Sequence, residues 1–123
     1  MTDQDYLKLA IQAGKKGLDN NDGGPFGAII VKDDKIISGA HNTDLSDTDP
    51  TAHAEINAIR KAAKILNSYH LKNCTLYTSS EPCPMCLGAI YWAHIKRVIF
   101  ITDRKDVAEV SKFDDKMIYD EIS

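Results

Sequence analysis

The sequence lacks any apolar run near the roughly 20 residues that a transmembrane helix requires. Its first residues, Met1 to Asp5, show neither the basic start nor the apolar stretch of a secretory signal peptide. Basic residues are also few, because 15 Lys and Arg stand against 18 Asp and Glu, for a net charge of −3. Proteins that bind nucleic acid normally carry an excess of positive charge. We therefore expect no membrane association and no nucleic-acid partner.

Cysteine is scarce too, with three residues, Cys74, Cys83 and Cys86. The number is odd, and two of the three are separated by only two residues, a spacing typical of a metal or redox site. A disulfide scaffold is therefore not expected, and the pattern favours a reducing, cytoplasmic compartment. The 123 residues are 43% hydrophobic and 27% charged, which predicts one globular domain over 1–123.

Hydrophobic periodicity predicts an alternating series of helices and strands. In chain order we expect a helix over 3–19, a turn over 20–25, a hairpin with arms at 28–31 and 36–40, a helix opened by Asp49-Pro50 as N-cap and first-turn proline, a strand over 75–78, a helix from about 84 to 93 and a strand over 98–101. This order predicts a three-layer α/β/α sandwich, with a mixed sheet that begins in an N-terminal hairpin. The last two strands should be parallel because a helix connects them.

Two short motifs, His53-Ala54-Glu55 and Pro82-Cys83-Pro84-Met85-Cys86, carry the chemistry. A catalytic zinc needs three protein ligands and one open position, and His53, Cys83 and Cys86 supply the three, for one Zn²⁺ per subunit. The two cysteines would share the first turn of a helix, whose N-terminal dipole favours thiolates. His53 and Glu55 can both face the ion if it lies beyond the N-terminus of their helix. Glu55 would then carry the proton of a water activated by the zinc to a ring nitrogen or to a leaving amine.

Other interpretations of these motifs stay open. A Cys-x-x-Cys pair at a helix start also occurs in thioredoxin-like redox proteins. A purely structural zinc would need a fourth ligand, which His41, His70 or His94 could provide, and the protein would then be a non-catalytic zinc-stabilised binding module. Glu81 is interpreted as a local structural acceptor, and Cys74 as a buried small hydrophobe.

Most of the chain resembles the cytidine-deaminase-like superfamily and, within it, the bacterial zinc-dependent guanine deaminases. The similar segments are Gly23-Gly24-Pro25-Phe26-Gly27-Ala28, the stretch from Asp49 to Glu55, the stretch from Tyr77 to Ala93, and Phe113-Asp114-Asp115. The whole superfamily shares the metal motif, in which His-x-Glu precedes Pro-Cys-x-x-Cys. The Gly-Pro-Phe-Gly, Tyr-Trp-Ala and Phe-Asp-Asp segments are those that resemble the guanine deaminases.

The resemblance implies the cytidine deaminase-like fold and the zinc-dependent hydrolysis of guanine, a small nucleobase, to xanthine and ammonia. It implies that Asn42 bonds the base through its side-chain amide. Phe26 and Trp92 would form the walls of the pocket, and Ala54 would offer backbone groups. Asp114 would face the N–H groups of the base or relay protons. Guanine carries ring and amino donors, which a carboxylate and an Asn carbonyl can accept.

The resemblance also implies a homodimer, commonly domain-swapped, in which a C-terminal segment closes the active site of the partner. We expect the segment from about residue 103 to pack on a partner subunit. The sequence stops at Ser123, before the end of such a segment, which leaves the lid and the dimer arrangement open at this point. Deaminases of cytosine, or of the wobble adenosine of tRNA, are the alternative enzymes.

Overall fold

The first helix begins where its sequence predicts. In the computed structural model, which describes residues 1–101 and 107–111, helix α1 runs over Asp3–Asp19. Thr2 is its N-cap: the Thr2 hydroxyl accepts from the N–H of Asp5, and the Asp5 carboxylate accepts from the N–H of Thr2. This reciprocal capping box satisfies two N–H groups that have no intrahelical acceptor.

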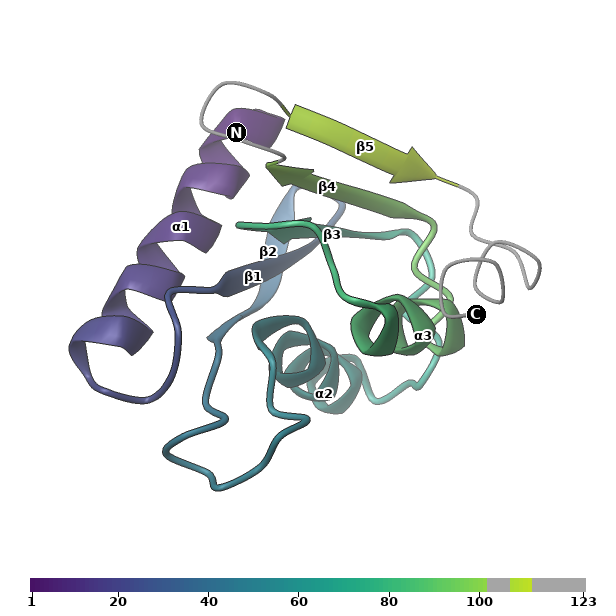
Figure 1. Ribbon diagram of the computed structural model, residues 1–123. Helices are drawn as coiled ribbons and strands as arrows, with labels where there is room; N and C mark the ends of the chain where they lie inside the picture. The colour runs from purple at the N-terminus through teal and green to yellow at the C-terminus, as the bar shows by residue number, and fades with distance from the viewer. Residues whose placement is uncertain (102–106, 112–123) are drawn as a thin grey trace.

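The strands form one mixed sheet of five (Figure 1). They are β1 (Gly27–Lys32), β2 (Lys35–His41), β3 (Cys74–Thr78), β4 (Arg97–Ile101) and β5 (Val107–Ser111), in the spatial order β2-β1-β3-β4-β5. Strands β1 and β2 form the expected hairpin, and β3 and β4 are parallel, as the helical crossover between them predicts. The remaining neighbours pair antiparallel.

Helices cover both faces of the sheet. Figure 1 shows α1 on one side and α2 (Ala54–Leu66) and α3 (Pro84–Trp92) on the other. Alternate residues of β1 belong to different cores: Ala28 and Ile30 pack in the cluster with α2 and α3, whereas Ile29 and Val31 pack against α1. Burial on both faces explains why β1 is an unbroken apolar run. The predicted three-layer sandwich is confirmed.

The predicted start of the second helix is wrong. Helix α2 begins at Ala54, and His53, with an extended backbone, is its N-cap. Asp49 instead closes a local turn, because its Oδ1 accepts from the N–H of Thr51 at 2.8 Å and from the Thr51 hydroxyl at 2.7 Å. An Asp side chain can cap a turn or a helix with the same local hydrogen bond, so Asp49-Pro50 alone does not distinguish them.

The sequence after residue 103 predicts no strand, but the structure contains β5 there. Val107–Ser111 pairs antiparallel with β4 of the same chain. Its short sequence, Val-Ala-Glu-Val-Ser, has neither an apolar run nor strict alternation, so no local pattern predicts this strand. Asp114 and the expected Phe-Asp-Asp segment lie outside the described residues. Over the described ranges, no helix is long and apolar enough to cross a membrane.

Candidate metal centre and active site

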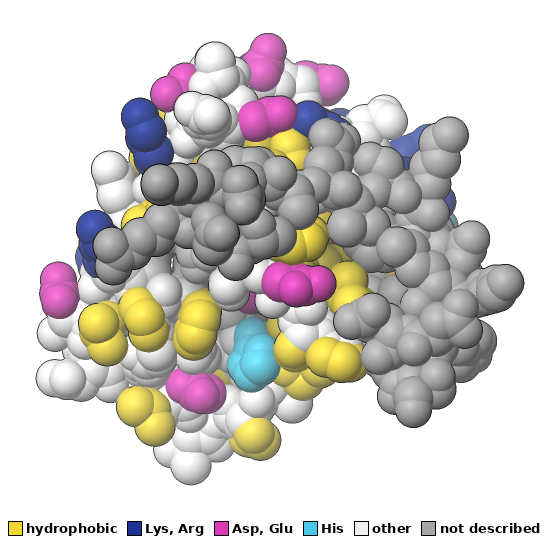
Figure 2. Space-filling model, turned by 45° about the horizontal axis from the view of Figure 1, so that its top comes forward, with side chains coloured by type: hydrophobic (Ala, Val, Ile, Leu, Met, Phe, Trp, Pro, Cys, Tyr) yellow, Lys and Arg dark blue, Asp and Glu magenta, His cyan; other side chains and the backbone are white. Residues whose placement is uncertain are grey.

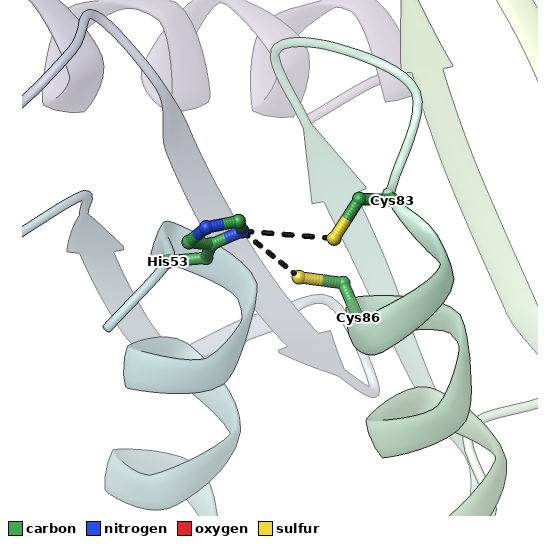
Figure 3. Close-up of side chains that lie close together, drawn as sticks. All are labelled: His53, Cys83 and Cys86. Atoms are coloured by element: carbon green, nitrogen blue, oxygen red, sulfur yellow. Dashed lines mark hydrogen bonds between the residues drawn. The ribbon is translucent and has the colours of Figure 1, made fainter. Parts of the chain in front are cut away.

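The three predicted metal ligands meet at the N-termini of two helices (Figure 3). His53 is the N-cap of α2, Cys83 is the N-cap of α3, and Cys86 lies in the first turn of α3. The Nδ1 atom of His53 lies 3.7 Å from the Sγ of Cys83 and 3.6 Å from the Sγ of Cys86. N-cap side chains usually accept a bond from the helix backbone, but neither His53 nor Cys83 does so. Both side chains point toward each other instead.

These distances fit a zinc ion. A tetrahedral zinc with Zn–N of about 2.0 Å and Zn–S of about 2.3 Å would hold a nitrogen and a sulfur ligand about 3.5 Å apart. The two observed separations are 3.6 and 3.7 Å, and all three ligand atoms lie within 4.8 Å of one another. A small tetrahedral cation therefore fits with little movement of the side chains.

The surroundings of Cys86 act on its thiol. Burial raises the pKa of this thiol above the usual range, and the nearby Glu55 and Cys83 raise it further. A bound zinc ion would lower it, since zinc binds the thiolate form. Its proton should leave only when a metal binds, so that metal binding and proton release are coupled.

No fourth protein ligand belongs to this group within the described residues. The Nε2 of His41 lies 2.8 Å from the Asp22 carboxylate, and the rings of His70 and His94 stack with centroids 4.1 Å apart. A structural zinc normally has four protein ligands, whereas a catalytic zinc keeps one position for water or substrate. The donor set therefore fits a catalytic centre.

A cavity of about 330 Å³ adjoins the metal ligands, a size at the lower end of ligand pockets. It is lined by Phe26, Asn42, Asp44, His53, Ala54, Glu55, Ser80, Glu81 and Cys83. These residues come from four separate chain segments, two of which are joined by reciprocal bonds between Gly27 and Ser79. On the face shown in Figure 2, a histidine side chain lies in a hollow among hydrophobic and acidic side chains.

Comparison with known proteins agrees with this site. Residues 1–102 match the family described as the cytidine and deoxycytidylate deaminase zinc-binding region. The chain belongs to this family. The guanine deaminase of Bacillus subtilis (strain 168) is 52% identical over 99% of the chain and 78% of its own length. The tRNA-specific adenosine deaminase of Aquifex aeolicus (strain VF5) is 44% identical over 88% of the chain and 72% of its own length.

The likeness extends to three dimensions. The X-ray structure of the Bacillus subtilis guanine deaminase superposes with a TM-score of 0.82 and 49% identity, over 99% of this chain and 77% of that one. The zinc-binding deaminase family thus explains why one His and two Cys converge, and its metal is zinc.

Four residues that the sequence predicts around the substrate of this deaminase line the same cavity: Phe26, Asn42, Ala54 and Glu55. Glu55 is only 7% exposed and adjoins the Cys86 thiol. Ala54 opens α2, where the backbone N–H groups have no intrahelical acceptor. The Oδ1 of Asn42 accepts one bond, from the N–H of Asp44 at 3.2 Å, and an amide oxygen can accept a second. Among the described residues no acceptor is found for its Nδ2, so this donor is also left for a ligand.

Trp92 is not among the residues that line this cavity. It lies at the end of α3, is 73% exposed, and borders a separate groove between α2 and α3. Sequence similarity cannot place Trp92, since the periodicity of a helix does not say which neighbour its outer face meets. Within this chain Trp92 does not form a wall beside Phe26.

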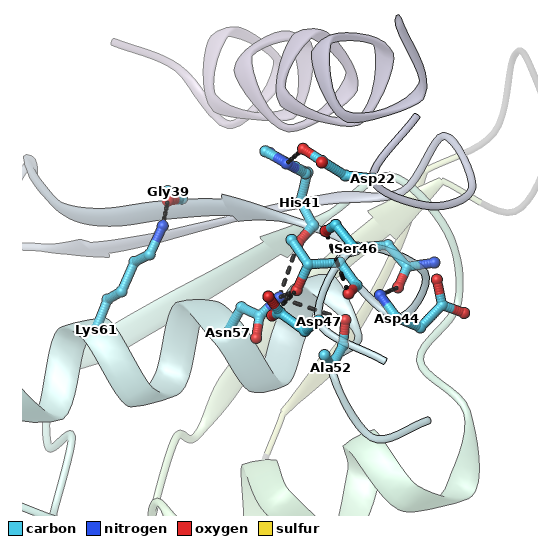
Figure 4. Close-up of polar contacts among 11 residues, drawn as sticks. Asp22, Gly39, His41, Asp44, Ser46, Asp47, Ala52, Asn57 and Lys61 are labelled. Atoms are coloured by element: carbon cyan, nitrogen blue, oxygen red, sulfur yellow. Dashed lines mark hydrogen bonds and ion pairs between the residues drawn. The ribbon is translucent and has the colours of Figure 1, made fainter. Parts of the chain in front are cut away.

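The sequence did not point to Asp44 or Asn57. Asp44 lines the cavity from a loop that has no motif. The Asn57 side chain in α2 donates to the carbonyl oxygens of His41 at 2.9 Å and of Ala52 at 3.3 Å, and so ties the loop that carries Asn42 and Asp44 at both ends (Figure 4). An Asn inside a helix is unfavourable without such bonds, and this was the signal available in the sequence.

Proposed function

We propose that this protein hydrolyses guanine to xanthine and ammonia. One observation carries the proposal: a buried carboxylate, that of Glu55, lines a base-sized cavity beside a complete set of zinc ligands. The chain that holds this site is 52% identical to a guanine deaminase over 99% of its length. Glu55 is the catalytic residue, and His53, Cys83 and Cys86 are the metal ligands.

In this reaction the zinc ion, Glu55 and the residues around the base have different roles. Zinc in this site supplies Lewis-acid activation of a water molecule. Glu55, which is buried from solvent, would take one proton from that water and deliver it to a ring nitrogen as the water oxygen bonds to the amino-bearing ring carbon. It would then take the proton of the new hydroxyl group on that carbon and deliver it to the departing amino group. The water oxygen replaces the amino group, which leaves as ammonia. Phe26 packs on the base, and Asn42 orients the base by donating from Nδ2. Asp114, which is not among the described residues, accepts from the N–H groups of the base or relays protons.

The alternative substrates differ in charge. Three carboxylates, those of Asp44, Glu55 and Glu81, line the cavity, and no Lys or Arg is among the described residues that line it. A neutral free base such as guanine or cytosine fits these surroundings better than the phosphates of an anticodon stem. Outside the cavity, Arg60 and Arg97 face Asp49 and Asp3. Both arginines are thus paired with acidic side chains of the same chain.

The substrate is tested by measuring ammonia release from the zinc-loaded protein with guanine, cytosine, adenine, their nucleosides and a tRNA anticodon stem. We expect release from guanine, with kcat/KM at least about a hundredfold above that for every other compound, as a missing or misplaced polar group in a buried site costs at least this much. Faster release from cytosine or adenosine would contradict the substrate, and no release from any compound would favour the binding module.

We also propose a homodimer in a cytoplasmic setting, formed through the groove between α2 and α3. The groove has a volume of about 730 Å³. It is lined by Ile56, Ile59, Arg60, Ala63, Tyr69, His70, Ala89, Trp92, Ala93 and His94. Tyr69 and Trp92 are 78% and 73% exposed, and such apolar patches often mark interfaces. The three cysteines are free, as a reducing compartment requires. A domain swap would use the segment from about residue 103.

Sedimentation tests the dimer. The chain of 13.6 kDa should sediment at twice this mass, and Trp92→Glu should shift it toward the monomer, because a charge in the apolar groove would be desolvated on association. Leu18→Glu on the exposed side of α1 is the matched control and should leave the mass unchanged. A monomeric parent protein would contradict the dimer, and a dimeric Trp92→Glu variant would contradict this interface.

A further inference from the structure

Asp44 carries a carboxylate that no structural role explains. It lines the cavity, and within the part of the chain that the structure describes its buried Oδ1 has no hydrogen-bond partner. No bond to Oδ2 is found among the described residues either, so Oδ2 is the oxygen that a ligand in the cavity can reach. A buried polar atom without a partner costs free energy, and native proteins retain few of them. A bond from a ligand to Oδ2 would offset part of the free energy that placing this carboxylate here costs.

The loop holds Asp44 in place. The Asp44 N–H donates to Oδ1 of Asn42 at 3.2 Å, and the Asp44 carbonyl accepts from the N–H of Asp49 at 3.1 Å. Gly23 lies directly beneath the carboxylate, since a Cβ there would lie 2.6 Å from Asp44 Oδ1. Asn57 ties the two ends of the same loop to α2 (Figure 4). The carboxylate is thus positioned before a ligand arrives.

Asn42 and Asp44 present complementary groups side by side. The bond from the Asp44 N–H to Asn42 Oδ1 orients the amide so that Nδ2 is a donor for which the described residues offer no acceptor, while the Asp44 carboxylate is an acceptor. A purine such as guanine has the opposite pattern, an acceptor next to a donor, at N3 and N9–H and again at O6 and N1–H. We infer that Asp44 is a specificity-determining residue, which accepts a hydrogen bond from a ring N–H of the base while Asn42 donates to the adjacent acceptor. This inference rests on the proposed function, because it takes the ligand to be a purine base.

The test compares Asp44→Asn with Asp33→Asn, the same change in the exposed hairpin turn. For each protein, kcat and KM are measured with guanine, and Kd is measured calorimetrically with hypoxanthine, which lacks the 2-amino group and is not consumed. Because a charge-assisted bond is lost, Asp44→Asn should raise KM and Kd about ten- to a hundredfold and change kcat less than about threefold. Asp33→Asn should match the parent. Asp44→Ala, which adds no amide donor, should show the same rise.

Methylated purines identify the donor. The parent should bind either 9-methylguanine or 1-methylguanine at least about tenfold more weakly than guanine, and Asp44→Asn should lose that particular discrimination. The inference is overturned if both Asp44 variants keep KM and Kd within twofold of the parent. It is also overturned if Asp44→Asn still discriminates fully against both analogues. Failure of the proposed function gives a different result: the parent would then release ammonia from a base other than guanine, or bind no purine.

Discussion

Replacing Glu55 with alanine should leave the zinc content of the protein unchanged and reduce kcat with guanine by about a thousandfold. The carboxylate is 7% exposed and faces the cavity beside the metal ligands, but it is not one of the three residues that group together as ligands. General acid–base catalysis contributes about a hundred- to ten-thousandfold. Metal analysis and steady-state kinetics on the same preparation separate the two properties.

Glu81→Gln is the matched control for this experiment. Glu81 lines the same cavity but is exposed, and it is interpreted as a local structural acceptor. The Glu81→Gln change should lower kcat by no more than about tenfold. An exposed carboxylate is hydrated, so it does not transfer the proton between the water and the base. Residual activity of Glu55→Ala above about one tenth of the parent would contradict the role of Glu55. Zinc lost together with activity would instead show that Glu55 supports the metal site.

Replacing Cys83 with alanine should abolish both zinc binding and turnover. The change removes one of three ligands and leaves the raised pKa of Cys86 to favour a protonated thiol. We expect less than about 0.1 zinc per subunit and at least a loss of about a thousandfold in kcat/KM. Removing zinc from the parent with a chelator should lower its melting temperature by about 5 °C or more, because the ion binds only the folded arrangement of α2 and α3.

Cys74 offers the corresponding control. It is buried at the start of β3 and belongs to the core, and the metal group does not include it. Cys74→Ala should therefore keep about one zinc per subunit and its activity, although a small cavity lowers its stability. If Cys83→Ala bound zinc as tightly as Cys74→Ala, the assignment of the ligands would be wrong.

Local patterns in the sequence predicted most of the elements and named the candidate ligands. The apolar stripe predicted α1, and the apolar run of β1 predicted a strand, because both signals act over a few neighbouring residues. His53, Cys83 and Cys86 could be named together because zinc chemistry restricts the residue types and their spacing. The boundary of α2 was wrong because Asp49 makes the same local bond in a turn as in a helix cap.

The remaining features depend on contacts between distant segments, which no local pattern encodes. The sheet order that places β3 between β1 and β4 brings the N-termini of α2 and α3 together, and only this arrangement makes one site of His53 and the two cysteines. Asp44 lines the cavity because hydrogen bonds from Asn57 hold its loop against α2. Trp92 faces a separate groove because of the packing of α3 against α2. The sequence by itself therefore determined which residue types and spacings could hold a zinc ion, and tertiary packing decided which side chains line the cavity beside them.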